Sequence, residues 1–299
     1  MKKLLILVLF MITISACSQN NGPVTVADII ADGAQVEKLA DGFAFTEGPA
    51  ADKQGNVYFT DQPNDDILEW SVDGHLSVFI DSAQRANGMY FDLNGDLLAC
   101  ADLHNRLVSI NMQDKSLTPI VTDYQGELLN GPNDLWVHPN GGIYFTDPYY
   151  RRPWWDRGDK KDMEIHGVYY LAPDRTTLTV IDKDMVQPNG IIGTPDGKTL
   201  YVSDINSQKT WKYTIKEDGS VTDKTLFCEE GSDGMTIDAQ GNVYLTNKGV
   251  SVFRPDGMHL GYIEVPEGPA NVCFGGADRG TLFITARKSL YAVKMKVTG

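Results

Sequence analysis

The feature of this chain that most restricts its fold is an internal repeat with a period of roughly 40 to 50 residues. Each copy begins with a polar residue and a short apolar run. A Gly turn follows, and then a second apolar run with Tyr or Phe that often ends in Thr-Asp or Ser-Asp. The second run occurs six times, as GNVYFTD (55–61), GDLLACAD (95–102), GGIYFTD (141–147), GKTLYVSD (197–204), GNVYLTN (241–247) and GTLFITA (280–286).

The repeated runs have the composition of β-strands. They are short, rich in β-branched and aromatic residues, and separated by Gly, Asn and Asp turn signals, and no stretch shows a convincing helical period. Six copies of about four strands each predict an all-β protein, a six-bladed β-propeller with four-stranded blades. We assign residues 34–299 to this domain.

The two ends of the repeat array predict how the ring closes. Five copies have a candidate fourth strand, such as residues 75–80 and 259–265, whereas the sixth copy ends with its third strand at about Val297. A blade without its fourth strand would leave an exposed edge. We therefore expect the segment before the first copy, residues 34–40, to join the last blade and close the ring.

The N-terminus has the organisation of a bacterial export signal. Two lysines precede an apolar run that is too short to cross a bilayer, and the string ISAC (14–17) follows. We interpret residues 1–16 as a lipoprotein signal peptide and residues 17–33 as a lipidated Cys17 with a polar tether. The alternative is an ordinary signal peptide followed by an incidental cysteine. Because Ser18 rather than Asp follows the cysteine, we expect a cell-envelope lipoprotein at the outer membrane, facing the periplasm and attached by its lipid only.

Charge and cysteine content narrow the range of partners. The formal net charge of −14 argues against nucleic acid, because phosphate binding needs a basic surface, and it is compatible with a protein that binds a cation. Besides Cys17, the cysteines are Cys100, Cys228 and Cys273, each in or beside an apolar run. Their number and spacing fit neither a zinc cluster nor a disulfide framework. We expect buried free thiols, with one disulfide as the alternative.

Every copy of the repeat begins with an oxygen-bearing side chain at an equivalent position. These residues are Glu47, Asn87, Asn133, Asn189, Asp233 and Asn271. In a propeller the first strand of each blade lines the central channel, so equivalent positions form one ring around the axis. The sequence therefore predicts two carboxylates and four amides around a common centre. The alternative is that the Asn-Gly and Asp-Gly pairs merely form turns.

A ring of this composition predicts a divalent cation near the axis. Buried polar groups without partners destabilise a fold, and two nearby carboxylates repel unless a cation or a proton intervenes. Oxygen ligands without His or Cys suit Ca²⁺ best, with Mg²⁺, Mn²⁺ or Zn²⁺ as alternatives. Spacing alone leaves open how many of the six side chains contact the ion.

Several strings at these positions resemble one known family. EGP, PND, PNG and SDGMTID occur in that order on the repeats, and GPANVCFGG follows near the end. Together they resemble the senescence marker protein/gluconolactonase/luciferin-regenerating enzyme family over about residues 36–297, and the last string is most similar to bacterial gluconolactonases. Mammalian members carry an arginine two residues before the middle Asn, where this chain has Gly131.

The resemblance implies a site and an activity. In that family a single divalent ion is held by the residues that match Glu47, Asn133, Asn189 and Asp233. Asn87 and Asn271 would then lie beside the metal and contact substrate. The activity of the family is hydrolysis of sugar lactones and, in some members, of other esters or phosphotriesters.

These features predict metal-assisted hydrolysis. A divalent ion polarises a lactone carbonyl and stabilises the developing oxyanion, and a carboxylate beside it takes a proton from the attacking water. The resemblance favours Asp233 as this general base, with Glu47 as the alternative. The chain has no Gly-x-Ser-x-Gly elbow, so a serine nucleophile is not expected.

The third copy carries an insertion, residues 147–167, with aromatic and basic residues in an unusual concentration. Aromatic rings beside charged donors commonly recognise sugar rings and carboxylates. We expect a lid over the channel mouth that binds substrate through Tyr149, Arg151, Trp154 and Trp155. The alternative is that these residues pack on the blade rim. His104 is a further substrate-binding candidate, with a surface-loop position as its alternative.

The function that the sequence predicts is hydrolysis of a small, carbohydrate-derived lactone. An arylesterase or phosphotriesterase using the same site is the nearest alternative. A non-catalytic periplasmic ligand-binding propeller has no need of a ring of carboxylates and amides. A quinone-dependent sugar dehydrogenase would need cationic and His side chains that the ring lacks. The oligomeric state is not predicted.

Overall fold

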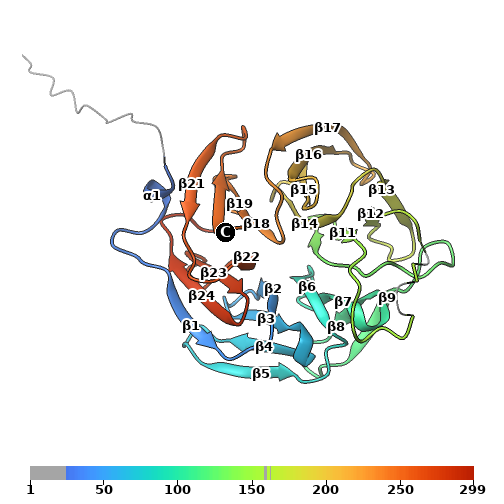
Figure 1. Ribbon diagram of the computed structural model, residues 1–299, viewed down its shortest axis with the longest axis horizontal. Coiled ribbons are helices and arrows are strands. Elements are labelled where there is room, and N and C mark those ends of the chain that lie inside the picture. The colour runs from blue at the N-terminus through green and yellow to red at the C-terminus, as the bar shows by residue number, and fades with distance from the viewer. Residues whose placement is uncertain (1–24, 158–159, 162) are drawn as a thin grey trace, which may run out of the picture.

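Six four-stranded antiparallel sheets surround a central axis, as predicted (Figure 1). The structure is a computed structural model that describes residues 25–157, 160–161 and 163–299. In each sheet the first strand is innermost, and in blades 1 to 5 the chain runs outward to the fourth strand. The first strand of each blade contacts the first strand of the next blade, so these strands together enclose the channel.

The blades follow the order of the repeats. Blade 1 contains β2 (Thr46–Ala51), β3 (Val57–Asp61), β4 (Asp66–Trp70) and β5 (Leu76–Ile80). Blade 2 contains β6 (Ala86–Phe91), β7 (Leu97–Ala101), β8 (Arg106–Ile110) and β9 (Leu117–Val121). Blade 3 contains β10 (Leu135–Val137), β11 (Ile143–Asp147), β12 (Gly167–Leu171) and β13 (Leu178–Asp182). Short 3₁₀ turns, η1 (Gln62–Asn64) and η2 (Asp102–His104), follow β3 and β7.

The second half of the ring is built in the same way. Blade 4 contains β14 (Pro188–Gly193), β15 (Thr199–Asp204), β16 (Lys209–Ile215) and β17 (Val221–Cys228). Blade 5 contains β18 (Met235–Ile237), β19 (Val243–Thr246), β20 (Val250–Phe253) and β21 (His259–Ile263). Blade 6 contains β22 (Pro269–Gly275), β23 (Thr281–Ala286), β24 (Ser289–Lys294) and the N-terminal strand β1 (Glu37–Asp41).

The N-terminal strand closes the ring, which confirms the prediction. β1 pairs antiparallel with β24, with Glu37 opposite Ala292 and Asp41 opposite Ser289. The strand lies at the C-terminal end of the expected segment, residues 34–40, and extends one residue beyond it. Its backbone groups cover the edge that β24 would otherwise expose.

A short segment before β1 also packs on the propeller. Residues 26–29 form helix α1 (Val26–Ile29), and the carboxylate of Asp28 accepts a hydrogen bond from the N–H of Thr25 at 2.6 Å. Ile29 is buried between blades 5 and 6. The folded part therefore begins ahead of residue 34, because Ile29, which lies in the expected tether, packs in the core. Cys17 and the signal peptide lie outside the described residues.

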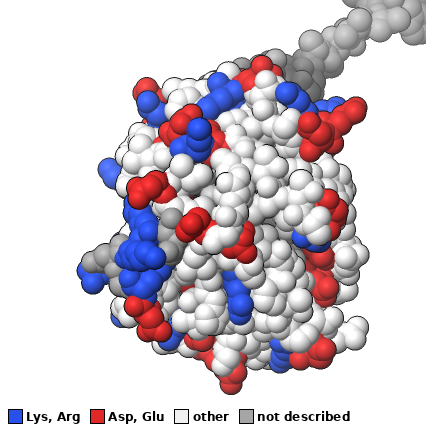
Figure 2. All heavy atoms as spheres, turned by 90° about the vertical axis from the view of Figure 1, so that its right-hand side faces the viewer, with Lys and Arg blue, Asp and Glu red and all other residues white. Residues whose placement is uncertain are grey.

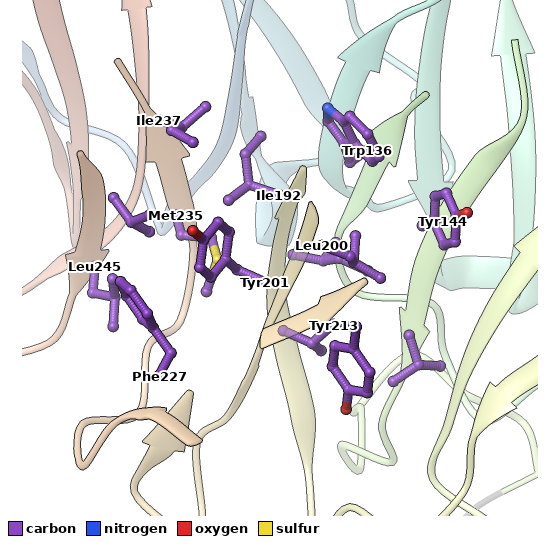
Figure 3. Close-up of a cluster of buried hydrophobic side chains, with 14 of the residues drawn as sticks. Trp136, Tyr144, Ile192, Leu200, Tyr201, Tyr213, Phe227, Met235, Ile237 and Leu245 are labelled. Carbon is purple, nitrogen blue, oxygen red and sulfur yellow. The ribbon is translucent and has the colours of Figure 1, made fainter. Parts of the chain in front are cut away.

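Apolar side chains fill the spaces between neighbouring blades. One cluster joins blades 3, 4 and 5, and Figure 3 shows Trp136, Leu200, Tyr201 and Phe227 of this cluster directed between the sheets. Four further clusters join blades 1 and 2, 2 and 3, 5 and 6, and 6 and 1. The three cysteines in the described part of the chain are buried and free, so the thiol prediction is confirmed. Within the same residues, no helix has the length and apolar character to cross a membrane.

Candidate active site

The structure brings the six ring residues together at one end of the axial channel. Four of them lie within the first strand of their blade, and Asn133 and Asp233 lie two residues ahead of it. Five of them are buried, namely Glu47, Asn87, Asn133, Asn189 and Asn271, and Asp233 is half-buried.

Glycines follow several ring residues because the next blade fills the space that a side chain would need. A Cβ built on Gly88 would lie 2.5 Å from the carbonyl oxygen of Asn133, and one on Gly234 would lie 1.9 Å from Cγ of Asn271. Neither glycine has a positive φ. The Asn-Gly and Asp-Gly pairs are therefore not turns here. They mark the close approach of the first strands around the axis.

Gly88→Ala should destabilise the propeller by about 1–3 kcal/mol, the usual result of forcing an extra carbon into a packed site. The Gly88 N–H also donates to the Asn133 carbonyl at 2.8 Å, and this contact would be disturbed. Chemical denaturation measures the loss. Gly268→Ala is the matched control, because the nearest atom to its Cβ would be 3.6 Å away. Equal effects of the two substitutions would contradict close packing at the axis.

Aspartates at the ends of second strands hold the segments that lead into the ring. Each accepts hydrogen bonds from two consecutive backbone N–H groups. The pairs are Asp61 with Ala44 and Phe45, Asp147 with Asn130 and Gly131, and Asp204 with Val186 and Gln187, at distances between 2.8 and 3.1 Å. The repeated Thr-Asp and Ser-Asp endings thus position the strands of Glu47, Asn133 and Asn189.

Blade 2 departs from this pattern. Its equivalent residue, Asp102, forms an ion pair with Arg152 of the insertion, with 2.8 Å between Oδ2 and Nε. Gln62 also donates to Asp102 at 3.3 Å. The Asp102 side chain is only 2 % exposed, and burial raises its pKa to about 6 although Arg152 opposes the change.

The electrostatics of the ring favour a positive charge. Burial raises the pKa of Glu47 well above its ordinary value, and the nearby charge of Asp233 adds to the effect. Burial likewise raises the pKa of Asp233, while hydrogen bonding by Asn189 opposes the change. A cation beside these two carboxyl groups would lower both pKa values and favour the ionised forms.

Asp134 is a third acidic group at the ring that the sequence analysis left without a role. It stands where four other copies have glycine. Its Oδ1 accepts a hydrogen bond from the Leu135 N–H at 2.9 Å, and its Oδ2 lies 3.5 Å from Nδ2 of Asn271. Burial raises its pKa to about 8. The string PND contained a signal for this residue, because its aspartate occupies a position at which most copies of the repeat have glycine.

The described residues fit a cation with oxygen ligands. They include no group of three or more His, Cys, Asp or Glu side chains arranged to hold a metal, so a cation here would need amide oxygens beside Glu47 and Asp233. Oδ1 of Asn189 and Oδ1 of Asn87 are buried without a hydrogen-bond partner in the described structure. Oδ1 of Asn271 differs, because it accepts from the N–H of Val272 at 2.8 Å. A mixture of carboxylate and amide oxygens is a donor set that Ca²⁺ accepts.

The blade 3 insertion folds back onto blade 2. Trp155 is 7 % exposed, its indole N–H donates to the Asp102 carbonyl at 2.7 Å, and the Arg157 guanidinium lies 4.0 Å from its ring centroid. The ring of Tyr149 lies 5.8 Å from that of Trp155. For these two residues the structure favours the rim-packing alternative over substrate contact. Gly131, with φ +145°, leaves room for Trp155, whose ring would lie 3.1 Å from a Cβ at this position.

Two other residues of the insertion reach the ring. The Tyr150 hydroxyl accepts a hydrogen bond from Nδ2 of Asn189 at 2.8 Å. The guanidinium of Arg152 lies 5.3 Å from the Tyr150 ring centroid, and its charge lowers the pKa of Asp233 against the effect of burial. The composition of the insertion drew attention to both residues together with their neighbours. It could not separate them from those neighbours, because the insertion has no counterpart in the other copies against which it can be aligned.

The remaining candidates are less enclosed. Arg151 is exposed, as is His104 at the end of η2. Trp154 is half-buried, with the guanidinium groups of Arg85 and Arg152 at 5.1 and 5.7 Å from its ring centroid. Figure 2 shows a dense group of basic side chains at the left of the view, although the chain is acidic overall.

The other end of the channel has a different chemistry. A cavity of about 790 Å³ opens there, and its lining includes Tyr90, Trp136, Ile192 and Phe274. Each of these residues lies three positions after a ring residue along the chain. The ring of carboxylates and amides therefore lies at one end of the channel, and the cavity at the opposite end combines apolar and aromatic side chains with polar ones such as Asp52, Asp92 and Arg279.

Fold and site together define a class: six-bladed propellers whose axial channel carries a ring of carboxylates and amides at one end, beneath an insertion from one blade. Comparison with known proteins agrees with this class. Residues 45–288 match the model of the SMP-30/gluconolactonase/LRE-like region. The chain belongs to this family, as the resemblance of its motifs indicated.

Relatives cover most of the chain. A gluconolactonase of Zymomonas mobilis is 32% identical over 294 residues, which cover 88% of this chain and 82% of that protein. The solved structure of a gluconolactonase from Xanthomonas campestris is 30% identical and covers 89% of this chain and 91% of its own, with a TM-score of 0.84. A calcium-binding regucalcin from Agrobacterium tumefaciens covers 88% and 94%, with a TM-score of 0.74. It is only 21% identical, so it shows the fold alone.

Proposed function

We propose that this protein hydrolyses the lactone of a sugar-derived acid, with one divalent cation held by Glu47, Asn133, Asn189 and Asp233. Family membership and the gluconolactonase relatives support a lactone hydrolase. Ca²⁺ is the first choice of cation because every ligand is oxygen. The calcium-binding description of the regucalcin neighbour agrees with that choice.

The observation that carries the proposal is that polar groups of the ring are enclosed without the partners they need. Two carboxyl groups with raised pKa values, the buried Glu47 and the half-buried Asp233, share the ring with a buried amide oxygen, Oδ1 of Asn189, that has no partner among the described residues. A binding propeller without a charged ligand would have no use for this arrangement, since each such group destabilises the fold until it is satisfied.

The mechanism divides into binding, orientation and proton transfer. When bound, the cation supplies a Lewis acid that polarises the lactone carbonyl. Asp233 takes the proton from the attacking water, and Glu47 is the alternative base. Asn87 and Asn271 lie in the same ring and are proposed to hydrogen-bond the substrate. Asn271 offers only its N–H donors freely, because its oxygen is already bonded to the backbone.

The insertion is proposed to form one wall of the substrate site. Arg152 and Trp154 present a cation and an aromatic face beside Tyr150, a combination suited to a polyhydroxylated ring. Arg151 and His104 remain candidates for outer contacts.

Proton release from a panel of substrates tests the function. Aldonolactones should be hydrolysed with a higher kcat/KM than aryl esters or phosphotriesters, measured at equal Ca²⁺ in a weakly buffered indicator assay. The reverse order would move the function to the arylesterase or phosphotriesterase alternative. Binding without turnover of any of the three classes would favour a ligand-binding propeller.

We also propose that the mature protein is an envelope lipoprotein anchored through Cys17. In a bacterial host, Cys17→Ala should move the protein from the membrane fraction to the soluble fraction and remove the lipid mass from its N-terminal peptide. Ser18→Ala is the control, because it leaves the lipidated cysteine in place. Unchanged membrane association of the Cys17 variant would support an ordinary signal peptide instead.

A further inference from the structure

We propose that Tyr150, a residue of the blade 3 insertion, is a positioning residue for the cation site. Its hydroxyl holds the amide of Asn189 so that the carbonyl oxygen is left for the cation, and the insertion and the cation therefore stabilise one another. The inference rests on the cation site of the proposed function and adds to it a residue from outside the ring.

The amide of an asparagine has two ends of similar shape and opposite polarity. Only the oxygen end can bind a cation, so an asparagine ligand needs a partner that accepts from its NH₂ group. The Tyr150 hydroxyl provides that partner for Asn189, at 2.8 Å from Nδ2. Asn189 is 1 % exposed, and its Oδ1 has no partner within the described residues.

Asn271 shows a different arrangement, in which the backbone occupies the amide oxygen. Its oxygen accepts from the backbone N–H of Val272, and its Nδ2 lies 3.5 Å from Asp134. The two amides therefore differ at the oxygen end: the Asn271 oxygen is occupied by the backbone, whereas the Asn189 oxygen is buried without a partner among the described residues.

Tyr150 is itself held from blade 2. The Arg152 guanidinium lies 5.3 Å from its ring centroid, and Arg152 pairs with the buried Asp102 at 2.8 Å. The indole of Trp155 donates to the backbone of the same aspartate. A continuous set of contacts thus runs from Asp102 on blade 2, through the insertion of blade 3, to Asn189 on blade 4. Asp102 can pair with Arg152 because, unlike Asp61 and Asp147, it does not accept hydrogen bonds, within the described part of the chain, from the backbone that leads into the first strand of its own blade.

Linkage makes the effect reciprocal. If Tyr150 favours the orientation of Asn189 that binds the cation, then the cation must favour the placement of the insertion that puts Tyr150 there, by the same factor. A purely structural role for Tyr150 would alter the stability of the fold without this dependence on the cation.

The test compares Tyr150→Phe with Tyr149→Phe in the otherwise intact protein, stripped of metal and titrated with Ca²⁺ by calorimetry. Loss of the Tyr150 hydroxyl should weaken Ca²⁺ binding about 10-fold, the lower range for removal of a group that orients a ligand. Tyr149→Phe should bind Ca²⁺ as the wild type does, because its buried hydroxyl has no hydrogen-bond partner among the described residues. Equal affinity of the Tyr150 variant and the wild type would overturn the inference.

Hydrogen exchange provides a second readout that does not depend on activity. Ca²⁺ should slow exchange of backbone amides in residues 149–157 of the wild type, and the protection should be lost in Tyr150→Phe. Protection of equal size in both proteins would show that the insertion senses the cation by another route and would reject Tyr150 as the link. If the wild type binds no divalent cation at all, the proposed function fails first, and that result is distinct from an unaltered affinity of the variant.

Discussion

Replacing Asp233 by asparagine should lower kcat for lactone hydrolysis by about 1,000-fold, within the usual range for removal of a general base. The substitution keeps an oxygen at the ring, so some cation binding should remain while proton transfer is lost. Circular dichroism and the melting temperature check that the fold survives. The proton-release assay with an aldonolactone measures the loss.

A matched control and an alternative outcome make this result informative. Asp256→Asn, on an exposed turn of the same blade, should leave turnover unchanged. Should Asp233→Asn retain wild-type turnover, the base would be assigned to Glu47, and Glu47→Gln would then be expected to show the loss. Retention of turnover in both variants would remove carboxylate base catalysis from this site.

Removal of divalent cations should abolish turnover and lower the melting temperature by about 5–10 °C. A ligand at a hundredfold excess over its Kd contributes about 2.7 kcal/mol to stability, and each kcal/mol shifts the melting temperature of a domain of this size by about 2–4 °C. The physical reason is that Asp134 and Asp233 act on the charge of Glu47, and this repulsion is no longer offset by a bound cation. Chelator treatment followed by scanning calorimetry, and then by re-addition of Ca²⁺, measures both effects.

The order of recovery among metals tests the choice of ion. Ca²⁺ should restore turnover and stability together, whereas Mg²⁺, which demands a tighter octahedral shell, should restore less of both. Full activity after exhaustive chelation would contradict a cation-dependent mechanism. Recovery of stability without turnover would assign the cation a structural role only.

The repeat made much of this fold predictable. Because six copies share one order of polar, turn and apolar residues, the register of one blade determines the register of all, and the missing fourth strand identified β1 as its replacement. The same register placed Glu47, Asn189 and Asp233 at equivalent positions. No single copy contained this information, since Asn-Gly in isolation reads as a turn.

The insertion could not be predicted in the same way, because it occurs in one copy only. Its composition indicated an interaction with sugars, and that was a poor guide to individual residues. Trp155 and Tyr149 pack against the rim and against Arg157, whereas Tyr150, their neighbour in sequence, contacts the ring. Which of several adjacent aromatic residues faces a site depends on tertiary contacts, and the decisive one, the Asp102–Arg152 pair, joins residues from two blades.

The joining of β1 to β24 also has a bearing on synthesis. Glu37 and Ala292 are neighbours in one sheet, although almost the whole polypeptide separates them. The chain leaves the ribosome N-terminus first, so β1 emerges early and its partner β24 emerges near the end. β1 therefore remains unpaired during most of translation. Local hairpins in the earlier blades can form during translation, but the final seam requires the closure of a very long loop. We therefore expect truncated products that lack β24 to remain open, with a free strand at each end that other chains can capture.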